Sequence, residues 1–307
     1  MIYTITLNPS LDYVVNIKTL AVGEVNRPEH EAIYPGGKGI NVSVMLARLG
    51  LPTVALGVTA GFTGEQITRL LGGCGCPHDF VTALQGISRL SVKILSGSET
   101  EINGCGPVIT QEELSAVLLR LGGVGQGDVV VLSGSVPQTA PADAYEQILS
   151  YCAARGASLA VDTTGERLLA SLSHRPLLIK PNRAELCELF GCEIAGTAQV
   201  VAHARLLQER GARHVLVSLG GEGAILVAED GAVYQANPPA GTVQCTVGAG
   251  DSMVAGFLAG LARGGEVQSA FALAMAAGSA TAYSPWLAAQ QDVPELADKI
   301  TVNKLTI

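Results

Sequence analysis

Apolar and polar positions along the chain follow two periods, one typical of strands and one typical of helices. Two expected strands, VVVL at 129–132 and LLIK at 177–180, are almost continuously apolar, and the segments between such strands carry apolar residues at helical spacing. Continuously apolar strands that alternate with helices are typical of a parallel sheet covered on both faces. The pattern therefore predicts an α/β fold.

Individual elements can be placed from the same pattern. Strands are expected at 2–7, 54–58, 128–132, 158–162, 177–180, 214–219 and 224–228. Helices are expected at 40–49, 64–71, 141–154, 184–190 and 198–210, and also from Thr110, after Gly250 and after Glu266. Thr110 and Glu113 have the spacing of a capping box, which supports the helix that starts there.

Two segments do not fit the parallel sheet. Residues 12–18 and 25–34 alternate polar and apolar, and so do residues 88–95 and 99–103, which flank the turn Ser96-Gly97-Ser98. This half-polar alternation predicts a small separate sheet made from two excursions of the chain, which we interpret as a lid. The expected core comprises residues 1–11, 35–87 and 105–307, and the expected lid comprises 12–34 and 88–104.

Composition narrows the classes of function. The 307 residues are 48% hydrophobic and 15% charged, as in a globular protein, and the formal charge of −8 argues against nucleic acid or an anionic membrane as a partner. The N-terminal segment lacks the features of a signal peptide, and no apolar run approaches membrane-spanning length. Seven cysteines, an odd number without a regular framework, suggest reduced thiols. A cytoplasmic protein is expected.

The stretch VGAGD at 247–251 carries the strongest chemical indication. Gly248, Ala249 and Gly250 come directly before an apolar helix, whose first amides have no partner within the helix and favour an anion such as phosphate. Asp251 adds a carboxylate that could accept a proton from an attacking hydroxyl. The alternative is that Asp251 only complements the helix dipole and the glycines only close a turn.

A second glycine-rich stretch, PGGKGIN at 35–41, also begins a helix. Gly37 permits close approach of a ligand to the backbone, Lys38 supplies positive charge, and Asn41 offers both a donor and an acceptor. The spacing is not that of a Walker P-loop. A simple helix start with an exposed lysine is the alternative.

Two further stretches follow expected strands, where open α/β sheets bind their ligands. In KPNRAE at 180–185, Lys180 could meet a phosphate, and Asn182 and Glu185 could reach a hydrated Mg²⁺ ion or could merely cap a helix. In SLGGEG at 218–223, glycines such as Gly220 and Gly223 could leave room for a purine or could serve only the turn.

Charged residues on or beside the expected lid form the last group of candidates. Asp12 could bind sugar hydroxyls, and Arg27, Arg89 and Lys93, together with Lys38, could bind a phosphate on a substrate. Ordinary surface charge is the alternative for each of them.

In this order and separation, TLNPSLD, PGGKGIN, LSGSVP, KPNRAE, SLGGEG and VGAGD resemble the motifs of the PfkB or ribokinase-like family of carbohydrate kinases. The chain is most similar to the branch of 1-phosphofructokinases and tagatose-6-phosphate kinases. The resemblance implies a three-layer α/β/α domain with a small β lid that often serves dimerisation. It also implies ATP-dependent phosphorylation of a sugar hydroxyl, with fructose 1-phosphate as the first expected substrate and tagatose 6-phosphate as its rival.

The resemblance also implies a role for each matched residue. Asp251 is similar to the catalytic base, and Gly248, Ala249 and Gly250 are similar to the anion hole. The implied ligand contacts fall into three sets: substrate at Asp12, Gly37, Lys38, Asn41 and Arg89; ATP at Lys180, Asn182, Ser218, Gly220, Gly223 and Gly250; and Mg²⁺, through water, at Asn182 and Glu185.

Two other classes of function remain open at the level of sequence. The first is an NAD-dependent dehydrogenase, although Met253 stands where the third glycine of its fingerprint would be and the motif lies near the C-terminus. The second is a catalytically silent sugar-phosphate sensor, which the presence of Asp251 disfavours.

Overall fold

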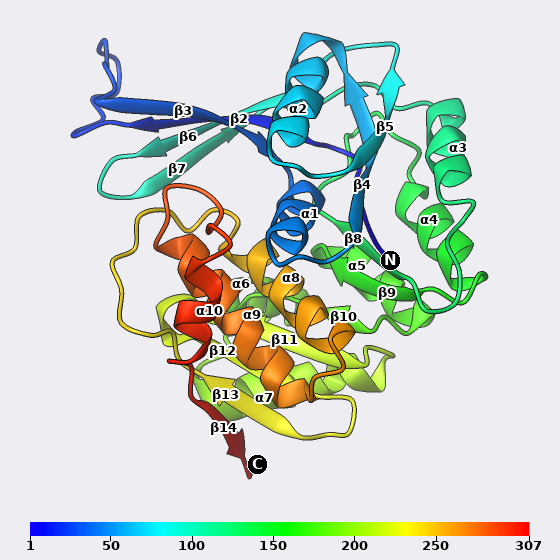
Figure 1. Cartoon of the computed structure of the whole chain (residues 1–307), viewed down its shortest axis with the longest axis vertical. Coiled ribbons are helices and arrows are strands. Elements are labelled where there is room, and N and C mark those ends of the chain that lie inside the picture. The colour runs from blue at the N-terminus through cyan, green and yellow to red at the C-terminus, as the bar shows by residue number, and fades with distance from the viewer. Residues whose placement is uncertain (307) are drawn as a thin grey trace.

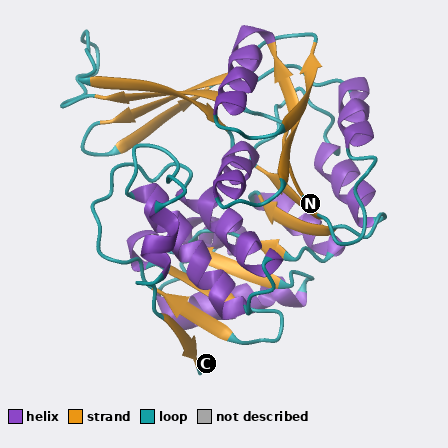
Figure 2. Cartoon of the chain, in the orientation of Figure 1, coloured by secondary structure: helices purple, strands orange, loops and turns teal. Residues whose placement is uncertain are grey.

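The computed structural model describes residues 1–306 and consists of a large sheet with helices on both faces and a smaller sheet that projects from it (Figure 1 and Figure 2). The large sheet has the strand order β14-β13-β12-β11-β10-β9-β8-β1-β4-β5. From β11 to β5 all neighbours are parallel, and β12, β13 and β14 extend one edge with antiparallel pairs. The predicted α/β fold with a mostly parallel sheet is confirmed.

The strands of the large sheet are short and mostly buried. They are β1 Ile2–Thr6, β4 Thr53–Ala60, β5 His78–Ala83, β8 Val129–Ser133, β9 Ser158–Asp162, β10 Leu178–Ile179, β11 His214–Ser218, β12 Ala224–Val227, β13 Val233–Ala236 and β14 Val302–Leu305.

The helices divide into two layers, each with its own hydrophobic cluster against the sheet. One layer holds α1 Lys38–Arg48, α2 Gly61–Gly73, α8 Ala249–Ala262, α9 Val267–Ala282 and α10 Asp292–Ala297. The other holds α3 Gln111–Arg120, α4 Ala144–Ala153, α5 Gly165–Ser171, α6 Arg183–Phe190 and α7 Gly196–Glu209.

Helices α8 and α9 form the closest helix pair on their face of the sheet, because small residues line the contact. A Cβ atom placed on Gly260 would lie 2.4 Å from Cα of Ala270, and one placed on Gly256 would lie 2.6 Å from the carbonyl oxygen of Leu273. The small, buried residues of the run after Asp251 therefore allow this close packing.

The small sheet contains β2 Ser10–Asn16, β3 His30–Gly36, β6 Arg89–Leu95 and β7 Glu99–Asn103 in the order β3-β2-β6-β7. Each excursion forms an antiparallel hairpin, and a parallel pair between β2 and β6 joins the two. The sheet was expected, but its mixed pairing could not be inferred, because the hairpin pattern says nothing about which strands meet. β3 continues through Pro35 to Gly36, two residues beyond the expected end of this segment at residue 34.

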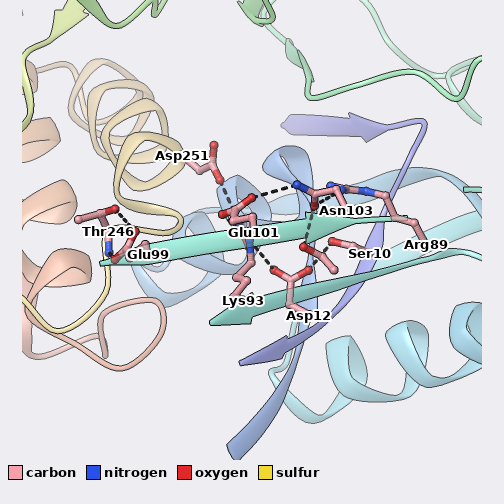
Figure 3. Close-up of polar contacts among 11 residues, drawn as sticks. Ser10, Asp12, Arg89, Lys93, Glu99, Glu101, Asn103, Thr246 and Asp251 are labelled. Carbon is pink, nitrogen blue, oxygen red and sulfur yellow. Dashed lines mark hydrogen bonds and ion pairs between the residues drawn. The ribbon is translucent and has the colours of Figure 1, made fainter. Parts of the chain in front are cut away.

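Register gives the small sheet two different faces, since side chains alternate along each strand and partners across a pair share a face. The polar face carries Ser10, Asp12, Arg89, Ser91, Lys93, Glu99, Glu101 and Asn103. The other face carries Leu11, Tyr13, Ile33, Leu90, Val92 and Ile102. The polar face is the one whose contacts reach the loops of the large sheet (Figure 3).

Five elements were not expected from the sequence: β5, α5, β13, α10 and β14. β5 begins with the polar residues His78 and Asp79, and β14 is only partly buried, so both lack the apolar run that identified the inner strands. Among the helices of residues 1–306, none has the length and apolar character needed to cross a membrane.

Candidate active site

The start of α8 lies at the carboxyl edge of the large sheet, next to a buried lysine. Gly248 caps the helix with φ of 79°, a left-handed conformation that glycine adopts without strain. The amide of Ala249 donates to the carbonyl of Thr246 over 3.1 Å, which leaves the amides of Gly250 and Asp251 as the donors at the helix start. A Cβ atom on Gly250 would lie 2.9 Å from Nζ of Lys180, so this lysine and the free amides face the same space.

Asp251 is buried in the first turn of α8, with 6% of its surface exposed. Its Oδ2 accepts a hydrogen bond of 2.7 Å from Nδ2 of Asn41, which lies in α1 and is 210 residues away in sequence. Burial, and then the charge of nearby Asp162, raise the pKa of Asp251 to about 6, although Lys38 and Asn41 act in the opposite direction. A carboxylate with such a pKa can take up a proton near neutral pH and release it again.

Asp162 is a buried carboxylate that the sequence analysis did not single out. It ends β9, is 2% exposed, and accepts a hydrogen bond of 2.9 Å from Nζ of Lys38, while Nζ of Lys180 lies 3.5 Å from its other oxygen. Burial raises the pKa of Asp162, but Lys180 and Lys38 outweigh that effect and lower it overall. Asp162 therefore remains ionised and holds both lysines at the carboxyl edge.

The position of Asp162 could have been read from the sequence, because SLAVD at 158–162 ends in an acid like a ligand-binding strand of an open α/β sheet. The partners of Asp162 could not be read from the sequence. Lys38 follows β3, Lys180 follows β10, and neither is near Asp162 in the chain. The lysine expected to meet a substrate is thus already paired with a carboxylate of the protein.

On the polar face of the small sheet, Asp12 belongs to a network of charged and polar side chains (Figure 3). Nζ of Lys93 is 3.7 Å from Asp12 and 2.8 Å from Glu101. Burial raises the pKa of Asp12, while Lys93 opposes that shift. A Cβ atom on Gly36 would lie 2.3 Å from the Asp12 carboxylate, so the first glycine of the GGK motif makes room for this side chain.

Arg89 lies at the end of this network nearer the large sheet. Its Nε donates to the carbonyl of Asn8 over 3.1 Å, and its Nη1 donates to Oδ1 of Asn103 over 2.6 Å. Gly37 caps α1 with φ of 111° and brings Lys38 and Asn41 to the same edge. The structure does not bring Arg27 to this group, because it lies exposed in the connection between β2 and β3.

A cavity of about 580 Å³ adjoins the start of α8. It is lined by all six residues expected to contact ATP: Lys180, Asn182, Ser218, Gly220, Gly223 and Gly250. Part of the remaining wall was not predicted, and this part includes Thr246 and three residues of α9, Met275, Gly278 and Ser279. A glycine-rich turn opposite an apolar wall suits a flat, partly polar ligand.

Asn182 and Glu185 form a capping box at the start of α6. Oδ1 of Asn182 accepts from the amide of Glu185, and Oε2 of Glu185 accepts from the amide of Asn182, each over 2.8 Å. The capping interpretation is therefore confirmed. Asn182 lines the cavity, and the oxygens of this pair are the donor type that Mg²⁺ prefers, so the residues fit an ion reached through water.

Comparison with known proteins assigns the chain to a family. The model of the pfkB family carbohydrate kinases matches residues 5–291, nearly the whole sequence. The chain belongs to the pfkB family of carbohydrate kinases. This assignment rules out the dehydrogenase considered from the sequence, and it agrees with the order of the six motifs.

Individual relatives extend the comparison. The chain is similar to a 1-phosphofructokinase of Bacillus subtilis, with 44% identity over 99% of this chain and 100% of that one. It is 36% identical to a D-tagatose-1-phosphate kinase of Bacillus licheniformis, over 99% of this chain and all of that one. A solved structure of Escherichia coli phosphofructokinase-2 with substrates and products matches with a TM-score of 0.90 and 30% identity, covering 97% of this chain and 98% of that one.

Membership of the pfkB family makes the chain an ATP-dependent sugar kinase. The Asp251 carboxylate, the amides of Gly250 and Asp251, and the two lysines held by Asp162 lie between the cavity and the polar face of the small sheet. A phosphoryl donor in the cavity and an acceptor hydroxyl under the small sheet would meet at Asp251.

Proposed function

We propose that the chain transfers the γ-phosphoryl group of ATP to the free primary hydroxyl of fructose 1-phosphate and so forms fructose 1,6-bisphosphate. The observation that carries the proposal is the position of Asp251, buried beside the amides of the α8 start and hydrogen-bonded to Asn41. The 44% identity to a relative named 1-phosphofructokinase supports the choice of substrate.

In the proposed mechanism, Asp251 accepts the proton of the attacking hydroxyl. The sugar oxygen then forms a bond to the γ-phosphorus, and the bond from that phosphorus to the β,γ-bridging oxygen breaks to release ADP. The amides of Gly250 and Asp251, together with Lys180, stabilise the charge on the transferred group. Asn41 holds the Asp251 carboxylate in place throughout.

In this proposal, the nucleotide binds in the cavity beside α8. We propose that Lys180, Asn182 and Gly250 contact the phosphates, and that Ser218, Gly220 and Gly223 border the base. Mg²⁺, reached through water by Asn182 and Glu185, would neutralise charge on the phosphates of the nucleotide.

In this proposal, the sugar phosphate binds between the polar face of the small sheet and the start of α1. Asp12 and Asn41 would bind hydroxyl groups, and Gly37, Lys38 and Arg89 would bind the existing phosphate. We propose that residues 12–34 and 88–104 act as a lid that closes over this ligand and keeps water from the phosphoryl group.

A coupled assay of ADP release over a panel of phosphosugars tests the proposal. The panel contains fructose 1-phosphate, fructose 6-phosphate, tagatose 1-phosphate and tagatose 6-phosphate, each at the same series of concentrations. We expect the highest kcat/KM with fructose 1-phosphate. A preference for a tagatose phosphate would replace the substrate proposed here, and the 36% identity to D-tagatose-1-phosphate kinase makes tagatose 1-phosphate the second candidate.

We also propose that the chain forms a homodimer through the lid. The face of the small sheet turned away from the site carries Ile33, Leu90 and Ile102, which are 49%, 42% and 60% exposed. Three large apolar side chains on one exposed face of a sheet are typical of an interaction surface.

A further inference from the structure

A carboxylate of the small sheet reaches across to the loop that precedes α8 (Figure 3). Glu99 begins β7, the edge strand, and lies on the polar face together with Glu101 and Asn103. Both of its oxygens contact a single residue of the core: the amide of Thr246 donates to Oε1 over 2.6 Å, and the hydroxyl of Thr246 donates to Oε2 over 2.5 Å. The sequence alone does not indicate that these two residues meet, because 147 positions separate them.

Thr246 connects this carboxylate to the anion-binding turn. Its carbonyl accepts the amide of Ala249, which closes the turn that presents Gly248 and Gly250. Thr246 also lines the proposed nucleotide cavity. One residue thus contacts the lid with its amide and hydroxyl and the start of α8 with its carbonyl.

The chain before Thr246 is fixed to the core by a hydrogen bond and by a buried side chain. The amide of Gln244 donates to the carbonyl of Ala282 over 2.8 Å, at the end of α9, and Cys245 is buried with 3% of its surface exposed. At the opposite edge of the small sheet, Tyr34 of β3 stacks on Trp286, with ring centroids 4.8 Å apart. Segment 244–246 is therefore held on one side by α9 and on the other by the lid.

We propose that Glu99 is a positioning residue that links closure of the lid to the order of the 246–250 turn, so that the sugar phosphate and the nucleotide strengthen each other's binding. The inference rests on the proposed function. When the lid lies closed, Glu99 satisfies both donors of Thr246 and the turn is held in its anion-binding form. When the lid opens, both donors lose this acceptor. A ligand that favours the closed lid thereby favours the nucleotide site, and the effect is reciprocal.

Equilibrium binding in a dead-end complex measures this link directly. MgADP is titrated into the protein by calorimetry, first alone and then with saturating fructose 1-phosphate, a combination that cannot turn over. For the native chain we expect fructose 1-phosphate to lower the Kd of ADP by about fivefold or more. In Glu99→Gln the amide group replaces one acceptor with a donor, so we expect this factor to fall below about twofold, with the Kd of ADP alone changed less than about twofold.

Four further variants separate positioning from a general loss of structure. Glu29→Gln changes another exposed carboxylate of the lid and should keep the native factor. Thr246→Val removes the hydroxyl donor, so fructose 1-phosphate should no longer lower the Kd of ADP, as in Glu99→Gln. Thr246→Ser keeps a hydroxyl donor, so the native effect of fructose 1-phosphate on the Kd of ADP should remain. A double variant of Glu99→Gln and Thr246→Val should be no worse than either single change, because both remove the same contact.

The possible outcomes distinguish the two proposals. If the native chain binds neither ADP nor fructose 1-phosphate, the proposed function fails. If it binds both, the inference is overturned either by a native factor near one or by a Glu99→Gln variant that keeps the native factor. Loss of the factor in Glu99→Gln and Thr246→Val, with retention in Glu29→Gln and Thr246→Ser, supports it.

Discussion

Asp251 combines two properties that are costly in a folded protein, since it is buried and lies near the ionised Asp162. Asn41 and the two lysines compensate for only part of this cost, and the pKa of Asp251 therefore stays above its ordinary value. A carboxyl group whose pKa is higher in the folded state weakens that state once it ionises. The residue best placed for proton transfer is thus one that reduces stability at neutral pH.

Replacing Asp251 with Asn tests both consequences. We expect Asp251→Asn to lower kcat by about 10²–10⁴-fold, because the amide cannot accept the proton, while MgADP binding persists. Asn41 can still donate to the new side-chain oxygen, so the local shape is kept. Activity assays of both proteins between pH 5 and 8 provide the measurement, and native kcat/KM should rise as pH increases through about 6. Near-normal turnover by the variant would contradict the role of base.

The same variant has a predicted effect on stability. Native Asp251 binds a proton more tightly when folded, so the stability it contributes is lost as pH rises from its unfolded pKa of about 4 through about 6. The Asn side chain does not ionise, so Asp251→Asn does not lose stability in this pH range. At pH 7.5 we expect the variant to be more stable than the native chain, by roughly 1–3 kcal/mol in urea unfolding, and at pH 4.5 we expect the difference to shrink. If the variant gained more stability over the native chain at pH 4.5 than at pH 7.5, the pKa of Asp251 would be lowered rather than raised by folding.

At the scale of elements, α8 serves two purposes through its two ends. Its first turn presents amides to the site, and its later glycines let α9 approach closely. The sequence predicts the helix and its special start, because glycine punctuation and helical periodicity are local patterns. It does not predict that α9 contributes a wall of the cavity, since that depends on how two helices pack.

A matched pair of glycine substitutions tests the packing role. Gly260→Ala would place its Cβ atom 2.4 Å from the backbone of Ala270, so we expect a loss of about 1–3 kcal/mol in the free energy of unfolding. Gly72→Ala, in the exposed last turn of α2, meets open space and should add about 0.5–1 kcal/mol instead. Urea denaturation of both variants provides the comparison. Equal effects of the two would show that glycine content, rather than close approach, determines the outcome.

At the scale of the whole molecule, the small sheet exposes Ile33, Leu90 and Ile102 of its apolar face to solvent in the single chain. If this face joins two copies, a charge placed on one of its exposed apolar positions should separate them. We expect Ile102→Lys to convert a dimer to a monomer, because the ammonium group would have to leave water on association. Leu119→Lys, on the exposed side of α3, is the control and should leave the mass unchanged. Light scattering after size exclusion gives the mass, and a native chain that is monomeric at micromolar concentration would refute the dimer.

The sequence by itself determined the alternation of strands and helices, the two excursions that form the small sheet and the stretches that gather at the carboxyl edge. Each of these follows from short-range periodicity, turn residues or motif spacing, which the chain carries locally. Only the tertiary structure decided which distant groups meet: Asn41 with Asp251, Asp162 between two lysines, and Glu99 with Thr246. The strands β13 and β14, at one end of the large sheet, belong with these contacts, because their pairing, like the meeting of two buried charges, depends on how separate segments pack and leaves no regular pattern in either one.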